Sequence, residues 1–111
     1  MPGKLTTHVL DTAKGKPAAG IRISLCRIEG GVHMPLGECT TNSDGRTDEP
    51  MIVGESFVTG LYELIFDVGG YFAGEGFLET VPLRFRIDNA EAHYHVPLLC
   101  TPWSYSTYRG S

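Results

Sequence analysis

The feature that most constrains the fold of this chain is a repeated alternation of apolar and polar residues with a period of two. It is clearest over residues 81–88, where apolar side chains at the odd positions alternate with Pro82, Arg84, Arg86 and Asp88. Because successive side chains of a β-strand point to opposite faces of a sheet, such a segment is typical of a half-buried strand. The pattern therefore predicts a fold made of short strands.

Turn-forming residues separate the alternating segments. Gly, Pro, Asn and Asp gather at residues 14–17, 29–31, 42–45 and 69–70, where these residue types favour tight turns. The 14 glycines and 7 prolines of the chain also disfavour long helices. We expect strands over residues 5–10, 21–26, 61–66, 81–88, 94–98 and 104–108.

One short helix is predicted over residues 70–75, after Asp67, whose side chain can cap a first helical turn. Seven or eight short strands with a single helical turn predict an all-β fold, a β-sandwich. A length of 111 residues is typical of one compact domain. We therefore expect residues 1–111 to form a single domain.

Charge and composition disfavour several classes of partner. The formal net charge is −4 and the isoelectric point is about 5.4, so we expect no nucleic acid as partner. No run approaches the 18 or more apolar residues of a membrane-spanning helix, so we expect no membrane association. The first residues lack the pattern of a secretory signal, and Cys26, Cys39 and Cys100 lie at wide spacings. These features predict a cytoplasmic protein with reduced thiols.

Two predicted strands carry histidines on the face opposite their core residues. Leu5 and Val9 share one face, so His8 lies on the other, and His93 and His95 lie opposite the apolar residues of their own strand. Three interpretations apply: solvated surface residues, metal ligands, or groups for acid–base chemistry near neutral pH. Two imidazoles about 7 Å apart on one strand could bind a metal, but no nearby residue supplies a third and fourth ligand, so we expect none.

Two further features have both a plain and a functional interpretation. Arg46 follows the turn at residues 42–45, and it is either a solvated loop arginine or a planar donor for a substrate oxygen. Aromatic and β-branched residues continue to within three positions of the end of the sequence. This predicts an ordered tail that holds the Ser111 hydroxyl at a fixed location, although chain ends are usually frayed.

These same segments resemble the transthyretin-related proteins, and within them the 5-hydroxyisourate hydrolases of purine breakdown. The resemblance extends over the whole chain, and its most specific motif is the Tyr-Arg-Gly-Ser that ends the sequence. The matching segments are residues 5–12, 15–20, 42–46, 66–67, 71–72, 93–99 and 105–111.

The resemblance implies a transthyretin-like (prealbumin-like) eight-stranded β-sandwich with one short helix. It further implies a homotetramer, a dimer of dimers, whose active sites lie at the dimer–dimer interface. The catalytic residues that it implies are His8, Arg46 and His95, and the residues implied to bind substrate are Tyr108, Arg109, Gly110 and Ser111.

The implied activity is hydrolysis of 5-hydroxyisourate, a small purine-derived substrate, to 2-oxo-4-hydroxy-4-carboxy-5-ureidoimidazoline in urate degradation. In this hypothesis His8 orients or deprotonates the attacking water, Arg46 stabilises the developing oxyanion, and His95 positions the ring or donates a proton. The reaction needs no cofactor. The alternatives are a non-enzymatic transthyretin-like small-ligand carrier, in which the catalytic residues are replaced, and an adhesive sandwich of immunoglobulin-like type.

Overall fold

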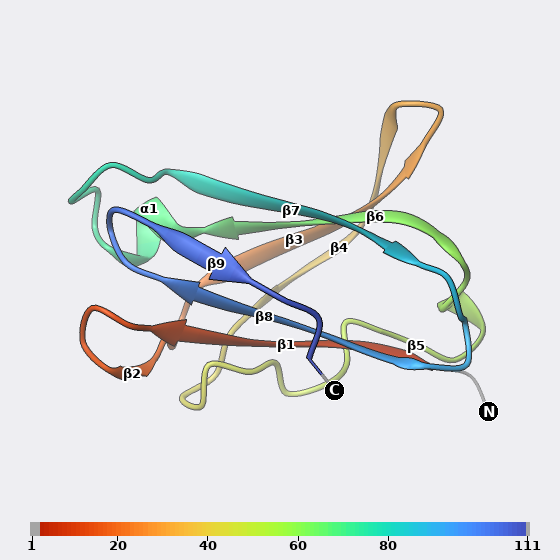
Figure 1. Cartoon of the computed structure of the whole chain (residues 1–111), viewed down its shortest axis with the longest axis horizontal. Helices are drawn as coiled ribbons and strands as arrows, with labels where there is room; N and C mark the ends of the chain where they lie inside the picture. The colour runs from red at the N-terminus through yellow and green to blue at the C-terminus, as the bar shows by residue number, and fades with distance from the viewer. Residues whose placement is uncertain (1–2, 111) are drawn as a thin grey trace.

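The computed structural model describes residues 3–110, which form two β-sheets packed face to face (Figure 1). Within these residues nine strands occur, against the expected eight, and two of the nine are only two residues long. The first sheet has the order β2 (Lys16–Pro17), β1 (Lys4–Asp11), β8 (His93–Cys100) and β9 (Tyr105–Thr107), with β5 (Ile52–Val53) also paired to β1. The second has the order β4 (Val32–Thr40), β3 (Arg22–Glu29), β6 (Gly60–Asp67) and β7 (Thr80–Ile87).

Buried and half-buried side chains alternate along the central strand β1, as the period-two pattern predicts. Along β1, Leu5, Thr7 and Val9 are buried, whereas the side chains between them are only half-buried. The β1 strand pairs in parallel with β8 along its whole length. The outer face of the first sheet is therefore formed by the alternate residues of these two central strands.

A single hydrophobic core fills the space between the sheets. Both sheets contribute fully buried aliphatic and aromatic side chains, which remove apolar surface from water and so stabilise the sandwich. The largest of them are Tyr62, Phe66, Leu5, Ile21, Ile23, Leu64, Ile87 and Leu98.

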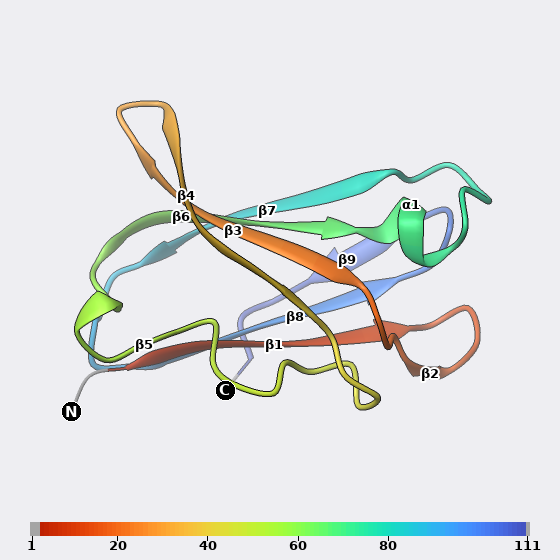
Figure 2. The same cartoon turned by 180° about the vertical axis from the view of Figure 1, so that it is seen from behind.

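The strand β4 was not among the strands expected from the sequence. Eight of its nine residues are exposed, because it is an edge strand whose hairpin with β3 extends away from the sandwich (Figure 2). Burial therefore imposes no apolar–polar alternation on it, and the strand also contains Pro35 and Gly37. A bulge in the pairing of β3 with β4 lies between Leu25 and Cys26.

The helix begins earlier than predicted. Helix α1 spans Val68–Tyr71, whereas the sequence predicted residues 70–75. Asp67 caps it as expected, since its side chain accepts a hydrogen bond from the backbone N–H of Gly70. The helix ends early because Ala73 and Gly74 adopt left-handed φ angles of 57° and 76°. A 3₁₀ turn, η1, spans Gly54–Ser56, and no helix between residues 3 and 110 is long and apolar enough to cross a membrane.

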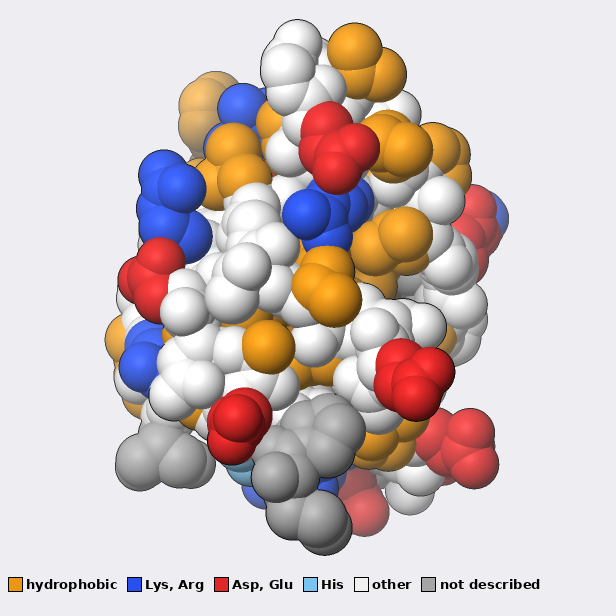
Figure 3. Space-filling view, turned by 90° about the vertical axis from the view of Figure 1, so that its right-hand side faces the viewer, with side chains coloured by type: hydrophobic (Ala, Val, Ile, Leu, Met, Phe, Trp, Pro, Cys, Tyr) orange, Lys and Arg blue, Asp and Glu red, His pale blue; other side chains and the backbone are white. Residues whose placement is uncertain are grey.

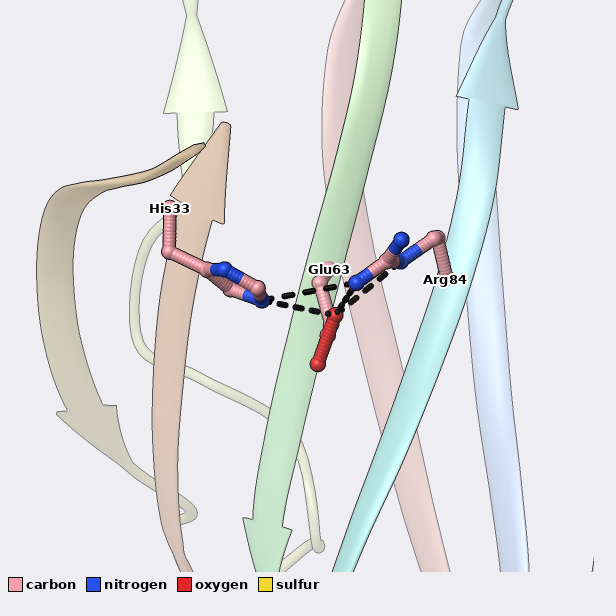
Figure 4. Close-up of polar contacts among 3 residues, drawn as sticks. All are labelled: His33, Glu63 and Arg84. Carbon is pink, nitrogen blue, oxygen red and sulfur yellow. Dashed lines mark hydrogen bonds and ion pairs between the residues drawn. The ribbon is translucent and has the colours of Figure 1, made fainter. Parts of the chain in front are cut away.

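The outer face of the second sheet carries a three-residue polar cluster (Figure 4). Glu63 on β6 lies between His33 on β4 and Arg84 on β7, and its side chain is only 8% exposed. The Arg84 guanidinium donates to Glu63 Oε2 at 2.9 Å, and His33 Nε2 lies 3.3 Å from the same oxygen. The cluster thus connects three strands of the second sheet, on the side opposite the predicted catalytic histidines.

Candidate active site

The predicted histidines lie on the outer face of the first sheet. His8 on β1 and His95 on β8 are both half-buried, while His93 is exposed. In the parallel register Thr6 pairs with His95 and Lys4 with His93. The two side chains of each pair therefore lie next to each other on the outer face of the sheet. Figure 3 views the sandwich from the end at which β1 begins, and histidine appears there only at the lower edge. The prediction that the histidines face away from the core is confirmed.

The His95 ring is held from two directions. Its Nδ1 lies 2.7 Å from the Thr6 hydroxyl oxygen. On another edge the ring meets Gly110, where an added Cβ would lie only 2.7 Å from His95 Cδ2. The backbone N–H of Gly110 also donates to the carbonyl oxygen of His95 at 2.7 Å. Only glycine fits against the ring at this position.

The turn before Arg46 is anchored to the first sheet by its glycine. Gly45 has a φ of +75°, and a Cβ there would lie 2.3 Å from the carbonyl oxygen of Val9. Val9 N–H donates to the carbonyl oxygen of Gly45 at 2.7 Å. The Asn42 side chain closes the turn by accepting from the N–H groups of Asp44 and Arg46. The Asn-Ser-Asp-Gly sequence thus fixes where Arg46 leaves the loop.

Arg46 and His95 line one open depression of about 460 Å³ on this face. Thr6, His93 and Lys4 line the same depression, as do Asp48 and Glu49 from the loop. The site therefore combines a guanidinium, imidazoles and a hydroxyl in one place open to solvent. This combination can bind a small polar molecule and exchange protons with it.

Burial and neighbouring charge keep His95 neutral. Burial lowers the pKa of His95, and the charges of Arg46, His93 and His8 lower it further. Burial also lowers the pKa of His93, with a contribution from the charge of Lys4. Both rings are therefore neutral near pH 7, the form that accepts a proton at one nitrogen and donates at the other.

The predicted substrate-binding tail divides into parts. Gly110 contacts His95, but the Arg109 guanidinium lies 4.1 Å from the centre of the Tyr94 ring, which belongs to the core-facing side of β8. Tyr108 is exposed, and it lines a separate groove with Arg109 and residues of β7. Gly110 contacts His95 but does not itself line the depression, and Ser111 lies outside the described residues.

Sequence reasoning did not assign any role to Thr6 or Lys4, and it assigned no catalytic role to His93, which it weighed as a solvated surface residue or a metal ligand. The signal for Thr6 was present, because it shares the outward face of β1 with His8. Its closeness to the histidines of β8, however, depends on a pairing between segments almost ninety positions apart. Within residues 3–110, no group of three or more His, Cys, Asp or Glu side chains could hold a metal ion.

Known sequences similar to this chain share almost its full length. The profile of the HIUase/Transthyretin family matches residues 5–110. A protein of Deinococcus radiodurans named 5-hydroxyisourate hydrolase is 58% identical over 99% of this chain and 97% of its own length. A second, 5-hydroxyisourate hydrolase 2 of Rhizobium meliloti, is 55% identical over 98% of this chain and 97% of its own.

Solved structures agree with this pattern. (S)-allantoin synthase matches with a TM-score of 0.92 and 50% identity over 99% of this chain, which spans 44% of that longer chain. The 5-hydroxyisourate hydrolase of Klebsiella pneumoniae matches with a TM-score of 0.84 and 35% identity, over 98% of this chain and all of its own. Sea bream transthyretin in complex with thyroxine matches with a TM-score of 0.89 and 25% identity, over 96% of this chain and 94% of its own.

Proposed function

The chain belongs to the HIUase/Transthyretin family, and from this premise we propose which of its residues carry out catalysis. Its activity is that of its full-length relatives, hydrolysis of 5-hydroxyisourate in urate degradation. We propose that the outer-face depression is the active site and that His8, Arg46 and His95 are its catalytic residues. The observation that carries this proposal is the shared depression of Arg46 and His95, beside which His8 is close enough to lower the pKa of His95.

The reaction opens a six-membered ring at a carbonyl beside a ring nitrogen. His8 orients the attacking water and takes one of its protons as the oxygen–carbon bond forms. Arg46 donates hydrogen bonds to the carbonyl oxygen, whose negative charge grows as the tetrahedral intermediate forms. The carbon–nitrogen bond then breaks, and the leaving nitrogen takes a proton. His95 donates this proton, or His95 holds the ring while His8 returns the proton that it took from the water. The product is 2-oxo-4-hydroxy-4-carboxy-5-ureidoimidazoline.

The tail completes the floor of the site in this proposal. Gly110 supports it by packing on the His95 ring and bonding to the His95 backbone. Arg109 acts indirectly, since its stacking on Tyr94 holds the tail beside β8. Tyr108 and Ser111 remain predicted substrate-binding residues.

We also propose a homotetramer, a dimer of dimers, with the sites at the dimer–dimer interface. Large apolar side chains on a monomer surface are typical of contacts with another protein, and three are prominent here. Phe77, Trp103 and Tyr108 are 76%, 69% and 60% exposed. The loop of Phe77 is joined to that of Trp103 by a hydrogen bond from Phe77 N–H to the carbonyl oxygen of Pro102. Light scattering after gel filtration should give four times the 12.1 kDa chain mass, and a monomer would contradict this proposal.

A small-ligand carrier remains the alternative function. The relevant structure, sea bream transthyretin in complex with thyroxine, is only 25% identical. The named hydrolases are 55–58% identical over nearly the full length.

We also keep the predictions that residues 1–111 are one domain, supported by the single core, and that the protein is cytoplasmic.

The test of the site follows hydrolysis directly. 5-Hydroxyisourate is generated in situ from urate with urate oxidase, and its absorbance decay is recorded with His8→Ala, with His95→Ala and with a chain lacking residues 108–111. Each should lower the rate about 100-fold or more, the range expected for an acid–base group, while circular dichroism stays unchanged. If the histidine variants fold normally and hydrolyse at the wild-type rate, the assignment is wrong.

A further inference from the structure

One hydroxyl group contacts both histidines of β8. Thr6 Oγ1 lies 2.6 Å from Nε2 of His93 and 2.7 Å from Nδ1 of His95. Both distances are within the range of strong hydrogen bonds to a hydroxyl. The two rings are 6.0 Å apart between centroids and inclined at 67°, so they converge on the hydroxyl from neighbouring positions. The parallel register that pairs Thr6 with His95 fixes this geometry.

The chemistry of a hydroxyl limits what the two rings can do. A threonine hydroxyl has one proton to donate, and a neutral imidazole has one N–H and one unprotonated nitrogen. Thr6 therefore cannot donate to His93 and His95 at the same time. When it donates to one ring, the nitrogen that faces it from the other ring must carry a proton to keep the second bond. The tautomers of the two histidines are coupled through Thr6.

We propose that Thr6 is a positioning residue for hydrolysis, which holds the orientation of His95 and couples its tautomer to that of His93 through one shared hydroxyl. This inference rests on the proposed catalytic role of His95. The Thr6 contact occupies Nδ1, so Nε2 is the ring nitrogen offered to substrate. His93 orients the hydroxyl and does not itself need to contact substrate.

The surroundings of the three residues favour this role. The positive groups that act on the two rings from outside the pair are Lys4, His8 and Arg46, and the carboxylates that line the same depression are Asp48 and Glu49. The net effect on both rings is a lowered pKa. At neutral pH each ring is thus uncharged, which is the state in which a choice of tautomer exists and in which Thr6 can set it.

Kinetics of three variants test the proposal. Thr6→Val keeps the shape of the side chain but removes the hydroxyl, and it should lower kcat at least tenfold with a smaller change in KM, because a misaligned group loses reactivity before it loses binding. Thr6→Ser restores the hydroxyl and should recover most of kcat. Thr12→Val is the matched control, since it removes a hydroxyl that donates to Cys100 O at the other end of β1, and it should keep the wild-type kcat.

Nitrogen-15 NMR of the histidine rings in the wild-type protein at pH 7.5 supplies a readout that needs no variant. It should find the nitrogens facing Thr6 in opposite states, one protonated and one not. If both carry protons, or neither does, the coupling is absent and the inference is overturned. If Thr6→Val keeps the wild-type kcat while His95→Ala loses most of it, the inference about Thr6 is overturned but the proposed function is not. A wild-type kcat in His95→Ala would instead overturn the proposed function.

Discussion

Replacing Gly110 with alanine tests how closely the tail must fit His95. The added Cβ would lie 2.7 Å from His95 Cδ2 and 3.3 Å from its Cβ and Cγ, and ordinary contact begins at 3.4 Å. The ring or the tail must therefore move by about 0.7 Å. Since a displacement of about 1 Å in an active site can lower a rate about 100-fold, we expect kcat/KM of Gly110→Ala to fall between about 10-fold and 100-fold.

The assay is hydrolysis of 5-hydroxyisourate generated in situ, with thermal unfolding measured in parallel. Gly30→Ala is the matched control, because Gly30 has a φ of +56° but no atom within 4 Å of an added Cβ, in the hairpin remote from the site. It should destabilise the fold by about 1–2 kcal/mol through its left-handed backbone and leave kcat/KM unchanged. If Gly110→Ala keeps the wild-type kcat/KM, contact between tail and His95 does not shape the site.

Four further predictions rest on named contacts. In an NMR titration, Arg46→Ala should raise the pKa of His95, since one positive charge that lowers it is removed, and an unchanged midpoint would show that Arg46 does not act on the ring. Acidification should also lower the free energy of unfolding. The pKa of His95 in the folded protein lies below the ordinary value of about 6.5. The stabilising effect of the neutral ring is therefore complete above about pH 6.5 and is lost as the pH falls through the lowered pKa of His95. Arg84→Ala should lower the free energy of unfolding by about 1–3 kcal/mol, because it leaves buried Glu63 with one partner fewer, while the rate of hydrolysis stays at the wild-type value. Denaturant unfolding measures the change in stability. A variant that loses activity but not stability would contradict the prediction that Arg84 serves the fold and not the site. Tyr71→Phe should lower that free energy by about 1 kcal/mol by removing a 2.9 Å bond to the buried carboxylate that ends β1, and calorimetry that finds no change in Tm would contradict it.

The sequence predicts the face of each central strand because burial enforces alternation there. His8 and His95 were assigned to the outer face on this ground, and both lie on it. The edge strand β4 was missed because no burial acts on its side chains. The same reasoning could not find Thr6 as a partner of His95, since the parallel pairing of β1 with β8 is a tertiary feature.

The conformation of the tail illustrates another limit. The residue pattern predicts an ordered end, and the resemblance implies that this end binds substrate, yet the structure places Arg109 on Tyr94 and Gly110 against His95. Tyr108 and Arg109 lie beyond the end of β9 and have no regular secondary structure, so no alternation in the sequence indicates which members of the motif face one site. The resemblance assigned the four terminal residues as a group, whereas the geometry gives the described ones distinct positions.

The central claim is that hydrolysis takes place in the depression that Arg46 shares with His95. The most direct test is the rate of in-situ 5-hydroxyisourate decay with Arg46→Ala, compared with Arg22→Ala, which removes an exposed arginine on the other sheet. We predict that Arg46→Ala lowers kcat/KM by about 100-fold to 1000-fold, as for the loss of an oxyanion donor, and that Arg22→Ala keeps the wild-type value. A folded Arg46→Ala protein with wild-type kcat/KM would contradict the account.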